Sequence, residues 1–203
     1  NMPAIMKLCG RAILLASGRI AGIGDTQPVV YRYLKGRISL AGERHFEARH
    51  PTTAEVTFTC VRVLDNERKV SAYVDVTKGL YLEITYKVHE RVHSAQVGFL
   101  LWNSQGICVL TSTNWDNNTS LYDRDLGTGE YCANCYIPGN CLRPGQYSVD
   151  IASSVPGYKM LDEIRDSIAF EAIDHGSIET KLSQGRLGVI APVLDWVTTK
   201  TVE

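Results

Sequence analysis

The 203-residue sequence has no long hydrophobic run and almost no excess of charge of either sign. A helix that spans a bilayer needs about 20 consecutive apolar residues, and no stretch of this chain approaches that length. The formal net charge is −1, so the chain has no bulk basic field to attract nucleic acid or an anionic lipid surface. No signal peptide is visible, because the apolar stretch at 12–16 is short and is flanked by charged residues. We therefore expect a cytoplasmic protein that does not bind nucleic acid.

Motifs of catalysis are also missing. The chain has no G-x-x-x-x-G-K-[ST] phosphate-binding loop, so no lysine of that motif can reach a nucleotide phosphate. It has no G-x-S-x-G nucleophile elbow, and the acidic stretch at 116–125 lacks the glycine and the terminal glutamate of an EF-hand. We predict no catalytic residue, no cofactor and no enzymatic activity. A glycosidase with paired carboxylates and a calcium-dependent sugar site remain alternatives, since folding can bring such groups together.

Six cysteines are present, and three of them lie close together in the sequence. Cys132-x-x-Cys135 followed by Cys141 is half of a zinc site, but no histidine or second C-x-x-C lies near it in sequence. Cys108 or His175 would complete a site only if the fold brought it close. We interpret the cysteines as reduced thiols that bind no metal, with zinc and a disulfide as the alternatives.

Residues 1–34 differ from the rest of the chain. They predict a short helix, strands at 11–15 and 19–23 around a glycine turn, and a second helix that begins at Asp25 or Thr26. Such a small set of elements cannot enclose a core, since a lone hairpin is marginal in water. We interpret this segment as the end of another domain.

The same segment resembles a known family. It reads N-M-x-x-I-x-x-L-C-x-R, then A-x-x-L-x-x-G-R-I, then G-x-x-x-x-V at 24–29 and Y-L at 33–34. This pattern resembles the segment that follows the switch histidine of ABC ATPases. The resemblance implies that 1–34 is a C-terminal remnant of a nucleotide-binding domain. Because the phosphate-binding loop is absent, we expect this chain not to hydrolyse ATP. Residues 35–53 are polar and punctuated by glycine, and we interpret them as a linker in which His45 and His50 are solvated.

From Ala54 onward the hydrophobic pattern has a period of two. In the stretch 80–88, apolar and polar residues alternate strictly, as they do in a strand with one buried face. Further strands are predicted at 54–64, 96–102, 107–113, 130–137, 146–153 and 167–173, with at most one helical turn within 155–165. About seven or eight short antiparallel strands with turns at this spacing predict an all-β sandwich over residues 54–203. Leu142, Gly145 and Tyr147 resemble the tyrosine corner of such sandwiches, so we interpret Tyr147 as structural.

The body carries a second resemblance. It contains V-G-F-x-x-x-N-x-x-G at 97–106, T-S-T-N at 111–114, L-x-x-G-x-Y at 142–147 and G-R-x-G-V-I-x-P-x-x-x-W at 185–196. Together these motifs resemble the C-terminal domain of Wzt-type O-antigen ABC exporters, over about 54–197. The resemblance implies an immunoglobulin-like β-sandwich, often dimeric, that recognises the finished O-polysaccharide before export. It also implies a transmembrane permease as partner and a location at the inner face of the inner membrane. Trp196 belongs to the last motif, and we interpret it as structural.

A glycan-binding site needs aromatic plates and planar polar side chains, because sugars present flat C–H faces ringed by hydroxyls. The segment 114–136 has that composition. Trp115 is the first candidate, since a tryptophan in a polar loop has little core to enter; the alternative is a loop anchor packed on the edge of the sandwich. Trp102 ends a predicted strand and is alternatively a core residue. The predicted carbohydrate-binding residues are Trp102, Asn114, Trp115, Asp116, Tyr122, Tyr131 and Tyr136.

Strand parity adds two expectations. Tyr131 and Tyr136 have opposite parity on one strand, so at most one of them faces a given sheet surface. Tyr81, Glu83 and Thr85 form the polar face of their strand, which lines a groove or is simply solvated.

The sequence is compatible with three functions. The first is non-catalytic recognition of a lipid-linked O-polysaccharide at its non-reducing end. The second is a dimerisation module of the transporter ATPase that binds no sugar. The third is a module that recruits an enzyme that modifies the end of the glycan chain.

Overall fold

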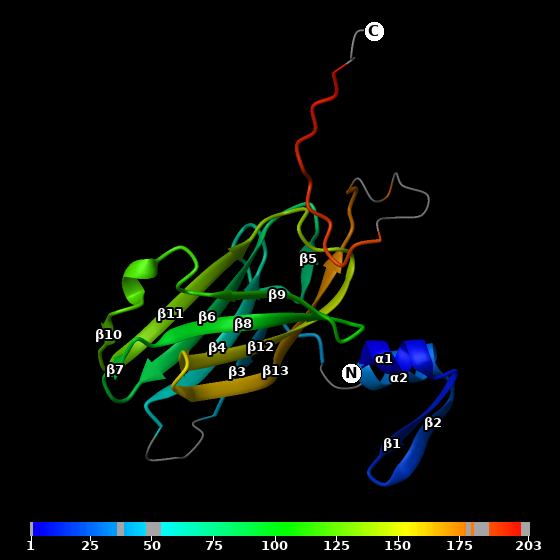
Figure 1. Cartoon of the computed structure of the whole chain (residues 1–203), viewed down its shortest axis with the longest axis horizontal. Coiled ribbons are helices and arrows are strands. Elements are labelled where there is room, and N and C mark those ends of the chain that lie inside the picture. The colour runs from blue at the N-terminus through cyan, green and yellow to red at the C-terminus, as the bar shows by residue number, and fades with distance from the viewer. Residues whose placement is uncertain (1, 36–38, 48–53, 178–179, 181–186, 200–203) are drawn as a thin grey trace.

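The computed structural model describes residues 2–35, 39–47, 54–177, 180 and 187–199. Most of them form a β-sandwich, and a small helix–hairpin–helix unit stands at the N-terminal end (Figure 1). None of the helices in these ranges is long and apolar enough to cross a membrane.

The N-terminal unit has the elements that the sequence predicts. They are α1 Met2–Leu8, β1 Arg11–Ala16, β2 Arg19–Asp25 and α2 Thr26–Lys35. The β1–β2 turn has positive φ at both Ser17 and Gly18, as a two-residue hairpin turn requires. The Thr26 hydroxyl donates to the Cys9 carbonyl at 2.5 Å and ties the start of α2 to the end of α1. Four large apolar side chains of the hairpin remain exposed, Ile13, Leu15, Ile20 and Ile23, so this unit does not enclose a core of its own.

One layer of the sandwich is a four-stranded antiparallel sheet in the order β11-β6-β4-β3. Its strands are β3 Glu43–His45, β4 Val56–Leu64, β6 Leu80–Val88 and β11 Gly129–Ile137.

The other layer is a five-stranded sheet in the order β5-β13-β12-β8-β9. Its strands are β5 Tyr73–Asp75, β8 Gln96–Asn103, β9 Cys108–Thr113, β12 Gly145–Val155 and β13 Lys159–Ile173. The β5–β13 pair is parallel and the other pairs are antiparallel. A short ribbon of β7 Val92–His93 and β10 Asp125–Leu126 and a 3₁₀ turn at Thr119–Leu121 complete the described elements.

The core lies between the two sheets and follows the predicted alternation. The five apolar residues of β6 are all buried, namely Leu80, Leu82, Ile84, Tyr86 and Val88. They belong to the same cluster as Val97, Phe99 and Leu101 of β8. The tyrosine corner is confirmed, because the buried Tyr147 donates its hydroxyl hydrogen to the Arg143 carbonyl at 2.8 Å. The all-β sandwich predicted from the sequence is thus the observed fold.

The structure departs from the sequence prediction at two places. The strand predicted at 167–173 begins earlier, at Lys159, because β12 and β13 continue as a hairpin in which Ile151 pairs with Ile164 in the core. The segment 155–165 holds no helical turn, within the expected maximum of one. The turn between these strands is at Gly157, which has positive φ. Within the segment that we interpret as a linker, β3 pairs with β4 and so forms an edge of the sandwich.

Candidate functional site

The loop that follows β9 carries three of the predicted site residues. Asn114 accepts a hydrogen bond from the Val97 backbone at 3.0 Å through its side-chain oxygen. Asp116 accepts from the Ser112 hydroxyl at 2.6 Å and from the Thr113 hydroxyl at 3.1 Å. The bond from Ser112 holds the pKa of the Asp116 carboxyl below its usual value. These bonds engage the side-chain oxygens of both residues with the chain's own groups and fix the loop.

Trp115 lies in the same loop and packs edge-on against Tyr122, with ring centroids 5.1 Å apart. Its indole Nε1 is buried and has no hydrogen-bond partner among the described residues. Tyr122 is exposed. The arrangement fits the alternative interpretation of Trp115, a ring that anchors the loop and supports the exposed Tyr122.

Trp102 does not lie in the core. It alternates with Phe99 and Leu101, which point inward, so it lies on the outer face of the five-stranded sheet. Its Nε1 donates to Asp150 Oδ2 at 2.9 Å. Burial raises the pKa of the Asp150 carboxyl.

Tyr131 and Tyr136 lie on opposite sides of β11, as parity predicts. Tyr131 stacks on the buried Tyr86 with centroids 5.5 Å apart, and its hydroxyl donates to the Gly127 carbonyl. Tyr136 is 53% exposed and lies against Tyr81, with centroids 4.9 Å apart. The predicted site residues therefore occupy three separate regions: the loop after β9, the outer face of one sheet and the two sides of β11.

The outer face of the four-stranded sheet, here called the polar sheet face, gathers residues from four strands. In one row across the sheet, Glu43, Arg62, Glu83 and Asn134 pair in register. The next row consists of His45, Cys60, Thr85 and Cys132, and Tyr81 pairs with Tyr136 at one end. The register of the strands thus aligns polar side chains that are up to 91 residues apart in the chain, from 43 to 134.

An ion-pair network joins the first row. Arg62 donates from Nε to Glu43 Oε1 at 2.7 Å and from Nη1 to Glu83 Oε1 at 2.8 Å. Asn134 donates to the other oxygen of Glu83 at 3.4 Å. The hydrogen bond from Arg62 holds the pKa of the Glu43 carboxyl below its usual value. The row therefore presents fixed, planar hydrogen-bonding groups along the sheet.

The aromatic end of the face is shaped by a glycine. A Cβ at Gly79 would lie 2.2 Å from Cε2 of Tyr136, so only glycine leaves room for the tyrosine ring where it lies. The Arg68 guanidinium covers Tyr81 with its carbon 4.0 Å from the ring centroid. Aromatic plates and planar polar groups thus meet on one surface.

The cysteine cluster that the sequence suggests does not converge. Cys132 lies on the polar sheet face near Glu83. Cys135 has the opposite parity and its thiol lies near Ser112. All six cysteines are free. Among the described residues, the group of three or more metal-ligating side chains that does converge is Glu43, His45 and Cys60, which the sequence did not indicate because its members are separated by up to 17 residues.

Comparison with known proteins identifies the family. The family model of the Wzt C-terminal domain matches residues 47–185. The chain belongs to this family. The crystal structure of a Wzt C-terminal domain superposes with a TM-score of 0.59 at 15% identity, covering 84% of this chain and 95% of that one. This likeness confirms the sandwich fold.

Other solved structures match the Wzt-type sandwich less well. The CARDB domain of a Pyrococcus furiosus protein, solved with di-metal ions, has a TM-score of 0.37 at 14% identity and covers 64% of this chain and 99% of that one. A β-glucosidase from Listeria innocua has a TM-score of 0.35 at 11% identity and covers 63% of this chain and 17% of that one. A search of curated proteins finds no match. Membership of the Wzt C-terminal domain family supports a role in an O-antigen ABC exporter.

Proposed function

We propose that this domain recognises a lipid-linked O-polysaccharide, at its non-reducing end, through the polar sheet face, and so permits export by the ABC transporter. The observation that carries the proposal is the exposed Tyr136, packed on Tyr81 beside the row of Glu83, Asn134 and Arg62.

The chemistry of the face suits a sugar. A pyranose ring buries a C–H face on an aromatic plate, while its hydroxyls need donors and acceptors in fixed positions. Tyr136 offers the plate. Glu83 offers carboxylate oxygens and is oriented by Arg62, and Asn134 offers a side-chain amide that is oriented by its hydrogen bond to Glu83. In this proposal Tyr122, held by Trp115 near the start of β11 and so far from Tyr136 at its end, is a contact for another part of the glycan chain. Asn114, Asp116, Tyr131 and Trp102 stabilise the fold.

The proposal also assigns the parts of the chain. Residues 1–34 are the C-terminal remnant of the nucleotide-binding domain of the parent ATPase, residues 35–53 connect it to the sandwich and include its edge strand β3, and 54–203 form the rest of the carbohydrate-binding domain. The exposed apolar residues of the β1–β2 hairpin support this assignment, because they have the character of a surface that packs against more protein. Through that domain, the subunit would dock on the transmembrane permease at the inner face of the inner membrane.

The test is a calorimetric titration with the O-polysaccharide of the host and with its terminal fragments. We expect Tyr136→Ala and Tyr81→Ala to weaken binding about 10-fold, the equivalent of about 1.4 kcal/mol for a lost ring contact. Tyr158→Ala is the matched control, since Tyr158 is 79% exposed near the β12–β13 turn of the other sheet. Absence of binding by the unaltered chain, or an equal loss in all three variants, would contradict the proposal.

A second candidate function, dimerisation, is favoured by the C-terminal segment. Residues 187–199 have no regular structure and extend away from the sandwich (Figure 1). Two bonds hold the start of the segment, from the Ala191 backbone to the Cys141 carbonyl and from Arg143 to the Gly188 carbonyl. Beyond them Leu194, Trp196 and Val197 are exposed, with Trp196 at 86%. In a single chain Trp196 therefore lacks the packing expected of a structural residue.

Exchange of this segment between two copies would bury these side chains and give a homodimer. Light scattering after size exclusion tests the idea. We expect the unaltered chain to be a dimer and Trp196→Asp to shift it toward the monomer. A monomer in both cases excludes this function.

A further inference from the structure

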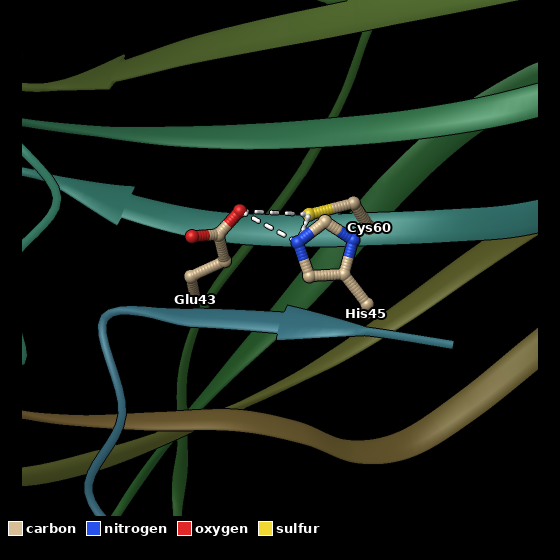
Figure 2. Close-up of side chains that lie close together, drawn as sticks. All are labelled: Glu43, His45 and Cys60. Carbon is tan, nitrogen blue, oxygen red and sulfur yellow. Dashed lines mark hydrogen bonds and ion pairs between the residues drawn. The ribbon is translucent and has the colours of Figure 1, made fainter. Parts of the chain in front are cut away.

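Three side chains of different chemistry converge at the β3 edge of the polar sheet face. Glu43 and His45 are two residues apart on β3, so they point to the same side of the sheet. Cys60 is the direct cross-strand partner of His45 in the β3–β4 ladder. Figure 2 shows the carboxylate, the imidazole and the thiol pointing toward one another.

The distances between the three donor atoms are close to those around a tetrahedral ion. His45 Nε2 lies 2.8 Å from Glu43 Oε1, and Cys60 Sγ lies 3.7 Å from that oxygen and 3.9 Å from that nitrogen. Zinc bonds of about 2.3 Å to sulfur and about 2.0–2.1 Å to nitrogen or oxygen place tetrahedral ligands about 3.3–3.6 Å apart. Movements of roughly half an ångström would therefore seat an ion among the three atoms.

We propose that Glu43, His45 and Cys60 bind a divalent metal ion of the zinc type. One carboxylate, one imidazole and one thiolate form a donor set that zinc accepts. Three protein donors leave the fourth position to water, and His45, with its side chain 68% exposed, keeps that position open to solvent.

The surroundings hold the donors in place. Arg62 donates to Glu43 at 2.7 Å, and hydrogen bonds of this kind orient ligating carboxylates. On the other side of β3, Arg44 donates to the Asp166 and Ser167 carbonyls of β13 at 2.8 and 3.1 Å. Gly42, next to β3, packs closely against Ser71: a Cβ added at Gly42 would lie 2.7 Å from the carbonyl carbon of Ser71. The strand that supplies two of the donors is thus fixed on both of its faces.

The test is a Co²⁺ titration of the chemically reduced chain, followed by the charge-transfer absorption of a cobalt–thiolate bond and by competition with Zn²⁺. We expect one ion per chain. His45→Ala and Cys60→Ser should weaken binding by about 100-fold or more, and Arg62→Gln by about 10- to 100-fold, the range typical of residues that orient metal ligands. Cys132→Ser is the matched control, an exposed thiol in the same row of the face, and it should bind as the unaltered chain does.

Three results would overturn the proposal: no cobalt–thiolate band in the unaltered chain, a band that persists in Cys60→Ser, or a band lost in Cys132→Ser. His45 is exposed, so His45→Ala should keep the fold, and it decides the question if Cys60→Ser does not fold. The experiment contains no saccharide, so its outcome is independent of the proposed glycan binding.

Discussion

At the scale of single residues, the molecule separates side chains that serve the fold from those that face outward. Asn114 and Asp116 have the chemistry of sugar ligands, yet their oxygens cap the chain's own loop. The outward-facing Tyr136 is less engaged by the protein itself: its ring lies on Tyr81, and over half of the residue is exposed. Composition alone cannot make this distinction, because the same residue types satisfy turns and bind sugars.

Gly79 gives a residue-scale test of the aromatic plate. In Gly79→Ala the new Cβ would collide with the ring of Tyr136. Because the far end of a side chain can rotate away, we expect the fold to persist and the polysaccharide affinity to fall about as much as in Tyr136→Ala. Gly127→Ala is the control, since its Cβ would meet only an ordinary contact at 3.9 Å. Unchanged affinity in Gly79→Ala, measured by the same calorimetric titration, would mean that the position of the ring does not matter.

At the scale of strands, the sequence predicts those in which apolar and polar residues alternate. Apart from β13, which was predicted only from residue 167, every strand of six or more residues in the sandwich was predicted near its observed bounds, since the apolar positions alternate and are buried. Strand β3 was missed because three polar residues carry no period. It pairs because Arg44 and the Gly42 backbone attach it to its neighbours. The start of β13 was predicted wrongly: the strand begins at Lys159 rather than at residue 167, because pairing such as that of Ile151 with Ile164 extends the β12–β13 hairpin.

Periodicity and strand parity also decide which parts of the candidate sites can be predicted. The opposite orientations of Tyr131 and Tyr136 follow from parity within one strand. The approach of His45 to Cys60 depends on which residues of two strands face each other. The register between two strands that no tight turn joins is set by tertiary packing, so this approach could not be predicted from the sequence.

Gly98 gives an element-scale test, because it lies where β8 and β9 approach closely. A Cβ there would lie 2.6 Å from the Ser112 carbonyl oxygen, a backbone atom that cannot rotate away. We expect Gly98→Ala to destabilise the fold by about 1–3 kcal/mol, as overpacking does, and Gly127→Ala to be nearly neutral. Urea unfolding measures both free energies. Equal stabilities would show that β9 shifts freely and that the β8–β9 contact is not tight.

At the scale of the whole molecule, the sandwich presents two surfaces with different proposed tasks. The polar sheet face has fixed charges and an exposed ring, as suits a hydrophilic ligand. The C-terminal segment is apolar and extended, as suits a second protein chain. The proposed glycan site and the proposed dimer contact use separate residues, so a mutation can abolish one function and leave the other intact.

The most direct test of the central proposal is to map where the glycan binds. Backbone amide shifts of the isotopically labelled chain would be followed by NMR while its O-polysaccharide fragments are added. The proposal predicts that the shifts which change cluster on β6 and β11, around Tyr81, Glu83, Asn134 and Tyr136. Changes confined to the loop at 114–124, or to the outer face of the five-stranded sheet around Trp102, would contradict it.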